Sequence, residues 1–266
     1  RASRPAEQRE TMSTPEFSVR LARSEADLLA AQRLRYEVFV RELGSDGPLV
    51  DHQGRFERDR FDPVSEHLVL VDARRSERAL EHVVGVYRLL DAAGAARIGQ
   101  YYSESEYDLD KLKASGRRLL ELGRSCLHGQ YRGGAAMFHL WAALAEVIAQ
   151  RQVELLFGVA SFHGTATAQL AQPLSLLHHR HLAPEALRVR ARAPGAQRMD
   201  LVSAQALDRR AAMMQVPALI KAYLRLGGVV GEGAFVDHAF NTTDVCLMLD
   251  VSAMSPRSRA IYEGRG

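Results

Sequence analysis

The sequence predicts an α/β protein in which a mixed β-sheet is flanked by helices. Helical and strand patterns follow one another in the order helix, strands, helix, strand, helix, strand. Hydrophobic residues make up 47% and charged residues 25% of the 266 residues, the balance of a globular protein that can bury a sizeable core. No internal repeat or linker is apparent, so we expect one α/β domain.

The first helix is expected over 25–43. Ser24 is a residue type that caps helix N-termini, and the apolar residues after it recur at helical spacing. The helix should end at Gly44, where a polar, glycine-rich loop begins. Two apolar runs, 67–73 and 82–90, are typical of strands and are joined by a charged turn.

The centre of the chain predicts a strand, a glycine turn and a helix in direct succession. The strand is expected over 118–127, and Gly133 and Gly134 precede the strongly apolar helical stretch 135–151. A short buried strand is expected over 153–160.

The C-terminal third has weaker patterns. Residues 165–179 have helical spacing, but Pro173 should break or kink the helix. Segment 184–215 is rich in Arg, Ala, Pro and Gly and predicts no defined element. A helix over 217–226 would carry a proline in its first turn, and 244–249 is the last expected strand.

Residues 17–250 are expected to form the single domain. The polar segment 1–16 is expected to be disordered, and 251–266 to be a loose tail. No apolar run approaches the ~20 residues needed to span a bilayer. Cys126 and Cys246 lie in apolar runs without disulfide or zinc spacing, which predicts buried thiols and a cytoplasmic protein.

The net charge of +3 is too small to indicate a nucleic-acid-binding protein. Nearly all of the positive charge is arginine, which suits anionic partners, although genomic base composition explains an arginine excess equally well. His178, His179 and His181 have no acidic or cysteine partner at ligand spacing, and they do not share one helix face. We therefore predict no metal site.

A glycine turn, Gln130-x-x-Gly133-Gly134-Ala135, ends the central strand and begins the next helix. Amides in the first turn of a helix have no intrahelical partner, and glycine allows an anion to approach them closely. The turn is too short for a P-loop and lacks its Gly-Lys-Ser/Thr, so nucleotide hydrolysis is disfavoured. We expect its backbone amides to hold an anionic, phosphate-containing group.

Glu121 and Arg124 form a second candidate site, on the strand before that turn. Strand alternation places their side chains on opposite faces unless a β-bulge, plausible at Gly123, re-aims one of them. A strand broken there would leave amides free to hold a thioester oxygen, and a carboxylate could take the proton of an attacking amine, directly or through water. The alternative is a structural ion pair between Glu121 and Arg124.

Several blocks of sequence resemble two related groups, the acyl-homoserine lactone synthases and the ornithine N-acyltransferases of bacterial ornithine-lipid synthesis. These blocks are LRYEVFVREL (34–43), ERDRFDPVSEHLVL (57–70), VGVYRLL (84–90) and LLELGRSCLHGQYRGG (119–134). The tryptophan that the lactone synthases carry after the first helix is missing here. The block 216–249, which contains FNTTDV, is similar to the ornithine acyltransferases, and the lactone synthases lack it.

The resemblance implies a GCN5-related N-acyltransferase fold, whose mixed sheet is centrally splayed, and it implies roles for named residues. Glu121 would be the general base or position a water, and Arg124 would orient the amino acid's carboxylate or steady neighbouring acids. The other implied sites are the amino-acid pocket (Arg35, Asp59, Asp62, Arg88, Asn241, Thr242), the phosphopantetheine turn (Gln130, Gly133, Gly134, Ala135) and the acyl channel (Phe39). For each residue a structural role as ion pair, turn cap or core side chain stays open; Arg35, in mid-helix, is expected to pair with one of the acids.

The implied function is N-acyl transfer from a (3-hydroxy)acyl carrier protein to the α-amino group of ornithine, which gives a lyso-ornithine lipid. No cofactor would be bound permanently, because 4′-phosphopantetheine arrives on the carrier protein. The enzyme would be cytoplasmic and would touch the inner membrane face. Transfer to glutamine or lysine, lactone synthesis, a non-catalytic carrier-binding module and a covalent intermediate on Cys126 are the alternatives.

Overall fold

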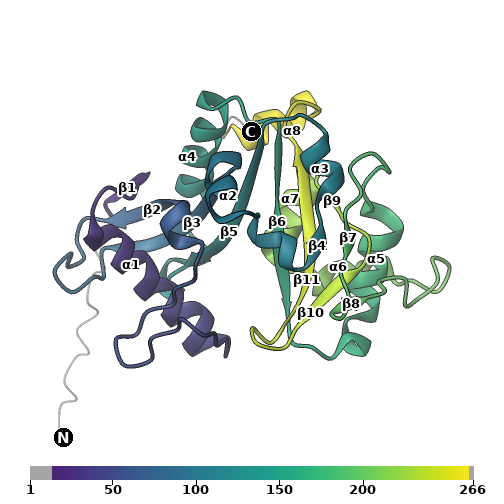
Figure 1. The fold of residues 1–266 in the computed structure, drawn as a ribbon, viewed down its shortest axis with the longest axis horizontal. Helices are drawn as coiled ribbons and strands as arrows, with labels where there is room; N and C mark the ends of the chain where they lie inside the picture. Colours follow the sequence, from purple (N-terminus) through teal and green to yellow (C-terminus); the bar gives the residue numbers. More distant parts are fainter. Residues whose placement is uncertain (1–13, 264–266) are drawn as a thin grey trace, which may run out of the picture.

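The computed structural model describes residues 14–263, which surround a nine-stranded mixed sheet (Figure 1). Its strands are β1 (Phe17–Leu21), β2 (Glu66–Asp72), β3 (Val83–Asp91), β5 (Leu119–Leu127), β6 (Leu155–His163), β8 (Ala196–Gln197), β9 (Val229–Val230), β10 (Ala234–Asp237) and β11 (Thr242–Asp250). The spatial order is β1-β2-β3-β5-β6-β11-β10-β8, with β9 paired to β11. Among the strands of residues 14–263, β5 and β6 are the one pair that forms a parallel ladder; β4 (Tyr107–Asp108) and β7 (Arg190–Ala191) form a separate antiparallel ladder.

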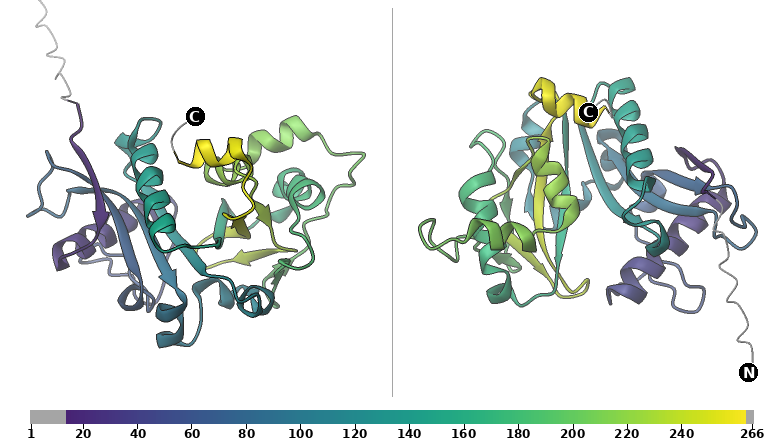
Figure 2. Two further views of the ribbon diagram at one scale, coloured as in Figure 1. Left: turned by 90° about the horizontal axis from the view of Figure 1, so that it is seen from above. Right: turned by 180° about the vertical axis from the view of Figure 1, so that it is seen from behind.

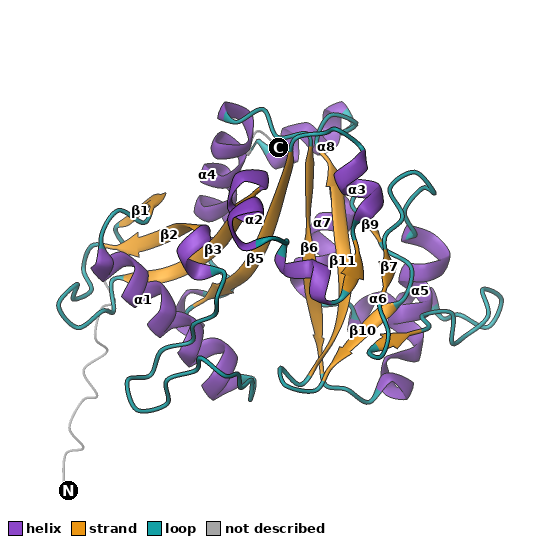
Figure 3. Ribbon diagram, viewed as in Figure 1, coloured by secondary structure: helices purple, strands orange, loops and turns teal. Residues whose placement is uncertain are grey.

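Helices cover both faces of the sheet (Figures 2 and 3). They are α1 (Glu25–Arg35), α2 (Ala92–Ile98), α3 (Asp110–Ala114), α4 (Ala136–Gln150), α5 (Ala171–His181), α6 (Arg209–Gln215), α7 (Ala218–Arg225) and α8 (Pro256–Tyr262). Five short helical segments are η1 (Tyr36–Glu42), η2 (Asp62–Val64), η3 (Tyr102–Ser105), η4 (Gly129–Tyr131) and η5 (Thr167–Leu170). Leu140 of α4 packs on Leu68 and Leu70, whereas Leu34 of α1 packs on Val69 and Val86 from the opposite face.

The sheet splays between its two parallel strands. β5 and β6 pair only from Leu119 with Leu155 to Glu121 with Phe157; beyond that point β5 continues beside β3 and β6 beside β11. At the fork, a Cβ on Gly158 would lie 2.1 Å from the carbonyl oxygen of Leu122, so this close approach requires glycine. The centrally splayed, mixed sheet that the resemblance implies is therefore present (Figure 1).

A β-bulge interrupts β5 immediately after the fork. Opposite β3, the pairing of Arg88 with Gly123 is followed by that of Val86 with Cys126, so β5 carries two residues against one. Arg124 has a φ of 50°, the left-handed region in which a bulge residue can be accommodated. A bulge was expected at Gly123; it is present one residue later, at Arg124 and Ser125, and it redirects Arg124.

The predicted helix over 25–43 is confirmed as α1 followed by a π-helical segment, η1, and Gly44 ends it with a φ of 74°. The helical stretch expected over 165–179 is present in two parts, η5 and then α5. The break lies before Ala171 and not at Pro173, which occupies the first turn of α5, where its missing N–H breaks no helical bond. β1, β10 and α6 were not predicted from the sequence.

The prediction of a loose tail over 251–266 also needs correction. Residues 256–262 form α8, and Met254 and Tyr262 pack into the hydrophobic cluster that includes Leu140 and Leu144 of α4. Of the segment 1–16, for which disorder was expected, residues 1–13 lie outside the described residues and β1 begins at Phe17. No helix within 14–263 has both the length and the apolar character that crossing a bilayer requires.

Candidate active site

A cavity of about 260 Å³ occupies the fork between β5 and β6. It is lined by 122–125 of β5 and 156–161 of β6, and by side chains from both faces of the sheet. Tyr102 and Phe157 belong to the face that α2 and α3 cover, whereas Leu156 and Tyr223 belong to the face that α4 and α7 cover. The cavity therefore passes through the sheet.

The two ends of this cavity differ in chemistry. The first is polar and carries the side chains of Arg124, Ser161, Thr242 and Asp244. The second is apolar and is lined by Tyr87, Leu122, Leu219, Tyr223, Leu247 and Leu249. One end can thus receive charged groups, and the other can accommodate a hydrocarbon chain.

Six alternating charges form a closed ring beside the polar end. The ring runs Arg35, Glu57, Arg124, Asp59, Arg88, Asp62 and back to Arg35. Arg124 Nε lies 3.1 Å from Glu57 and its Nη2 lies 3.0 Å from Asp59, while Arg88 Nη1 lies 2.9 Å from Asp62. Each charge has two opposite partners, which offsets the cost of burying it.

The ring accounts for most of the predicted amino-acid-binding residues. Arg35 pairs with Glu57 and Asp62, as expected of an arginine buried in mid-helix. Arg124 is the ring member that lines the cavity. The other ring members do not line the cavity and hold Arg124 in place through ion pairs. Contact of Arg35, Asp59, Asp62 or Arg88 with substrate therefore stays a prediction. Glu57 was not predicted, although it is the first acid of the loop stretch 57–62.

The ring also sets the charge states of its members. Burial alone would raise the pKa of Asp62, but Arg35, His67 and Arg88 hold it well below its usual range. The guanidinium of Arg124 lies 4.9 Å from the ring centroids of both Tyr102 and Phe240, an arrangement that favours the cation. Arg124 is therefore a fixed positive charge at the polar end.

Glu121 is buried, with 3% of its surface exposed, and it does not line the cavity. Its Oε2 accepts a hydrogen bond of 2.8 Å from the amide of Tyr102, and its Oε1 accepts bonds from the amide and hydroxyl of Ser103. Burial raises the pKa of Glu121, although the bonds from Ser103 and Tyr102 act in the opposite direction. The alternative of an ion pair with Arg124 was wrong, because Arg124 binds Glu57 and Asp59.

The glycine turn lies at the N-terminus of α4, outside the cavity lining. Gly133 has a φ of 77°, and a Cβ there would meet nothing within 4 Å. Among the described residues, no acceptor bonds the amides of Gly133, Gly134 or Ala135. Gln130 is exposed on η4. The turn is thus open to an anion, and phosphopantetheine binding stays a prediction.

The remaining predicted residues divide between the cavity and a turn. Phe39 and Thr242 line the cavity. Asn241 does not; it has a φ of 53° in the turn between β10 and β11, and its carbonyl oxygen accepts a bond from Gly164. Cys126 is buried against α1 instead of facing the cavity, and burial raises its pKa to about 12, which disfavours a thiolate nucleophile.

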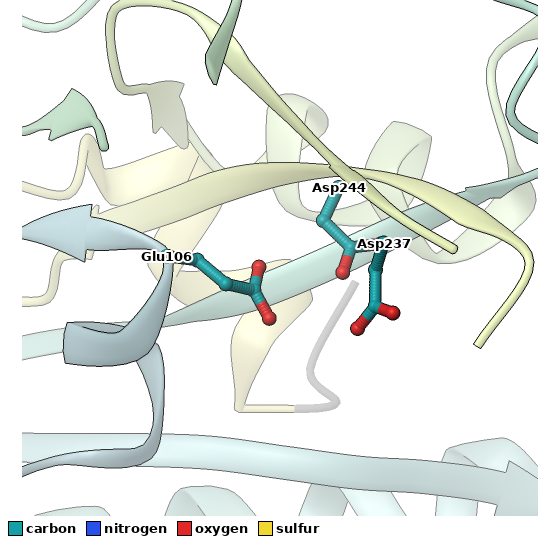
Figure 4. Close-up of side chains that lie close together, drawn as sticks. All are labelled: Glu106, Asp237 and Asp244. Atoms are coloured by element: carbon teal, nitrogen blue, oxygen red, sulfur yellow. The ribbon is translucent and has the colours of Figure 1, made fainter. Parts of the chain in front are cut away.

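Three carboxylates meet at the polar end, from Glu106, Asp237 and Asp244 (Figure 4). One oxygen from each lies within 4.8 Å of the others, a spacing that could also hold a metal ion. Burial, followed by mutual repulsion, raises the pKa of Glu106, and burial with repulsion from Asp237 raises that of Asp244. We call this group the acidic trio. Asp244 follows the FNTT stretch, the one sequence signal that pointed to it.

The sequence has relatives along almost its whole length. The L-ornithine N(alpha)-acyltransferase of Rhodobacter capsulatus is 61% identical over 254 residues, which cover 94% of this chain and 97% of the relative. The protein of the same name from Brucella abortus is 39% identical over 248 residues, covering 92% and 88%. The family described as "Acetyltransferase (GNAT) domain" matches residues 34–142.

Solved structures share the fold at low sequence identity. A CoA-dependent acyl-homoserine lactone synthase, BjaI, aligns with a TM-score of 0.52 and 16% identity, covering 94% of this chain and 89% of that chain. FeeM, an N-acyl amino acid synthase from uncultured soil microbes, aligns with a TM-score of 0.50 and 11% identity, covering 92% and 98%. The GCN5-related fold is confirmed, and the full-length relatives show that the chain belongs to the L-ornithine N(alpha)-acyltransferase family.

Proposed function

We propose that this chain transfers a (3-hydroxy)acyl group from an acyl carrier protein thioester to the α-amino group of L-ornithine. The main observation in support of this proposal is the cavity that passes through the splayed sheet, with charged groups at one end and apolar side chains at the other. An amino acid needs polar surroundings and a fatty acyl chain needs apolar ones, and this cavity joins both kinds of surroundings at the fork. The names of the full-length relatives support ornithine as the acceptor.

The donor would enter along the open side of the fork. Phosphopantetheine is the mobile arm of the carrier protein, and its phosphate would lie against the free amides of the glycine turn, with its thioester at the bulge. β5 no longer pairs with β6 beyond Glu121, so any backbone N–H group of 123–125 that faces β6 would be free to hold the oxyanion. The acyl chain would then extend toward Leu219 and Tyr223 of α7.

The acceptor would bind at the polar end. Its carboxylate would face Arg124, whose position the ion-pair ring fixes. The amine attacks the thioester carbonyl and forms the C–N bond, and collapse of the tetrahedral oxyanion breaks the C–S bond. The proton that the amine loses ends on the pantetheine thiolate, so the thiol leaves and no covalent enzyme intermediate is needed. We propose that Glu121 acts by positioning Tyr102; its role as direct proton acceptor stays a prediction.

The carrier protein as donor and contact with the inner membrane face are parts of this proposal. α7 directs Leu219 and Tyr223 at the cavity and buries Ile220. These contacts favour a role for α7 as a core helix that closes the acyl end.

The proposal is tested by incubating the purified chain with a 3-hydroxyacyl carrier thioester and each amino acid in turn. We expect free thiol and an N-acylated product, seen by mass spectrometry, with ornithine. Replacing the carrier by an acyl-CoA tests the donor, and S-adenosylmethionine as acceptor tests for lactone synthesis. An absence of thiol release with every acceptor would favour a non-catalytic carrier-binding module.

A further inference from the structure

The acidic trio has no basic partner. Among the described residues, no Lys, Arg or His nitrogen lies within 4.0 Å of a carboxylate oxygen of Glu106, Asp237 or Asp244. The six charges of the neighbouring ring are all paired, by contrast. The trio is thus an uncompensated concentration of acid in the part of the chain that the structure describes.

Two of its members are also deeply buried and incompletely bonded. Glu106 is 3% exposed and Asp244 is 4% exposed. Among the described residues, no N–H group and no serine, threonine or tyrosine hydroxyl donates to Oε2 of Glu106 or Oδ1 of Asp244. Buried polar atoms are costly to leave unpaired, and buried carboxylates more so. Such atoms aimed into a shared space indicate that a donor belongs there.

The trio borders the cavity at the end where the acceptor would bind. Asp244 lines the cavity directly, together with Thr242 from the same strand and Arg124 from β5. Arg124 also lowers the pKa of Glu106, which places its cation in the same electrostatic neighbourhood. The polar end therefore offers one fixed cation and, beside it, three carboxylates.

We propose that the acidic trio binds the side-chain ammonium group of a basic acceptor amino acid. An alkylammonium has three N–H donors, which match one oxygen from each carboxylate. A free diamino acid has a carboxylate for Arg124 and a distal ammonium for the trio. The inference rests on the proposed function and names the residues that would select the acceptor amino acid. Calcium or magnesium at the trio would need water or further oxygens to complete a shell of six or more ligands, and the experiments below distinguish such an ion from an ammonium group.

Binding experiments test the trio independently of catalysis. Calorimetry on metal-free protein, dialysed against EDTA, compares ornithine with norvaline, which has the same carbon chain but no terminal amine. We expect ornithine to bind at least ~100-fold more tightly, because an analogue that lacks the ammonium leaves buried acceptors unpaired. Equal binding of the two amino acids overturns the inference. Ornithine binding that is lost on chelation and restored by Mg²⁺ or Ca²⁺ also overturns it.

Variants link this preference to the trio. In Asp244→Asn and Glu106→Gln, the ratio of ornithine to norvaline affinity should fall at least ~10-fold. Asp110→Asn is the control, since Asp110 is an exposed acid on α3. Thermal melting shows that each variant is folded. A uniform loss of affinity for both amino acids in the trio variants would contradict the inference.

The two proposals fail in different ways. If the wild-type chain selects ornithine in binding but acylates no amino acid, the proposed transfer reaction is wrong and the ammonium site stands. If it acylates ornithine and norvaline with equal kcat/KM, the transfer reaction stands and the ammonium site is wrong.

Discussion

The amide of Tyr102 donates a 2.8 Å hydrogen bond to Oε2 of Glu121, which connects this buried carboxylate to the cavity through one residue. The ring of Tyr102 lines the cavity and lies against Arg124, while Ser103 occupies the other carboxylate oxygen. Both oxygens of Glu121 therefore face donors. The arrangement makes Glu121 a positioning residue for the polar end.

Glu121→Gln should lower kcat by about 10- to 100-fold, because a small displacement of Tyr102 misplaces the reacting groups. Glutamine replaces one carboxylate oxygen with an NH₂ group. Because Tyr102 donates to one oxygen of Glu121 and Ser103 to the other, this NH₂ group faces an N–H donor in either orientation of the amide. The pH–rate profile should keep its shape. Loss of the acidic limb of this profile would instead identify Glu121 as the proton acceptor. The control is Glu146→Gln, at an exposed position of α4.

Asp62 should couple stability to pH. Its pKa in the folded state lies well below the ordinary 3.8, so its stabilising effect is fully present above that value. The effect is lost as the pH falls further, because the unfolded chain then binds a proton that the folded chain does not. Urea unfolding between pH 3 and 6 measures this slope.

Asp62→Asn should reduce the acid slope and lower the free energy of unfolding at pH 7 by about 3–5 kcal/mol. The loss is large because Arg35 and Arg88 would each lose a buried partner. Asp110→Asn should leave both quantities near the wild-type values. Parallel pH curves for the wild type and Asp62→Asn would count against the ring as the source of the slope.

Gly133→Val should raise KM for the acyl carrier protein by about 10-fold or more, since a side chain would cover the free amides of the turn. Gly116→Val is the matched control: its φ of 68° and open surroundings resemble the 77° and open surroundings of Gly133. Both variants should lose about 1–2 kcal/mol of stability from the strained φ. Equal KM values in the two variants would argue against the turn as the phosphate site.

Leu219→Trp should shift the acyl-chain preference toward shorter chains. Leu219 lines the apolar end, and a larger side chain fills space that a long chain needs. We expect kcat/KM for a sixteen-carbon donor to fall at least ~10-fold more than for an eight-carbon donor. Met214→Trp, at a site that is 74% exposed, controls for the substitution itself. An equal loss with both donors would mean that the chain does not lie along α7.

Local patterns in the sequence determined the main elements. The apolar periodicities of α1, α4 and β5, the stop at Gly44 and the bulge after Gly123 follow from backbone geometry over a few residues, which neighbouring residue types report. The ordered blocks likewise identified the family. The position of the helix break near Pro173 and the structure of the C-terminal tail were misjudged, because helix starts, and short helices held by packing, leave weak local signals.

Tertiary structure alone decided which charges meet. Glu106, Asp237 and Asp244 come from a loop and two paired strands, and nothing local to any one of them reports the other two. Packing over β5 likewise decides two other features. The 57–62 loop brings Glu57 to the ion-pair ring and so closes it, and η3 brings Tyr102 to Glu121, which therefore faces Tyr102 and not the cavity. Charged partners are chosen by distance in space and by burial, and a one-dimensional pattern contains neither.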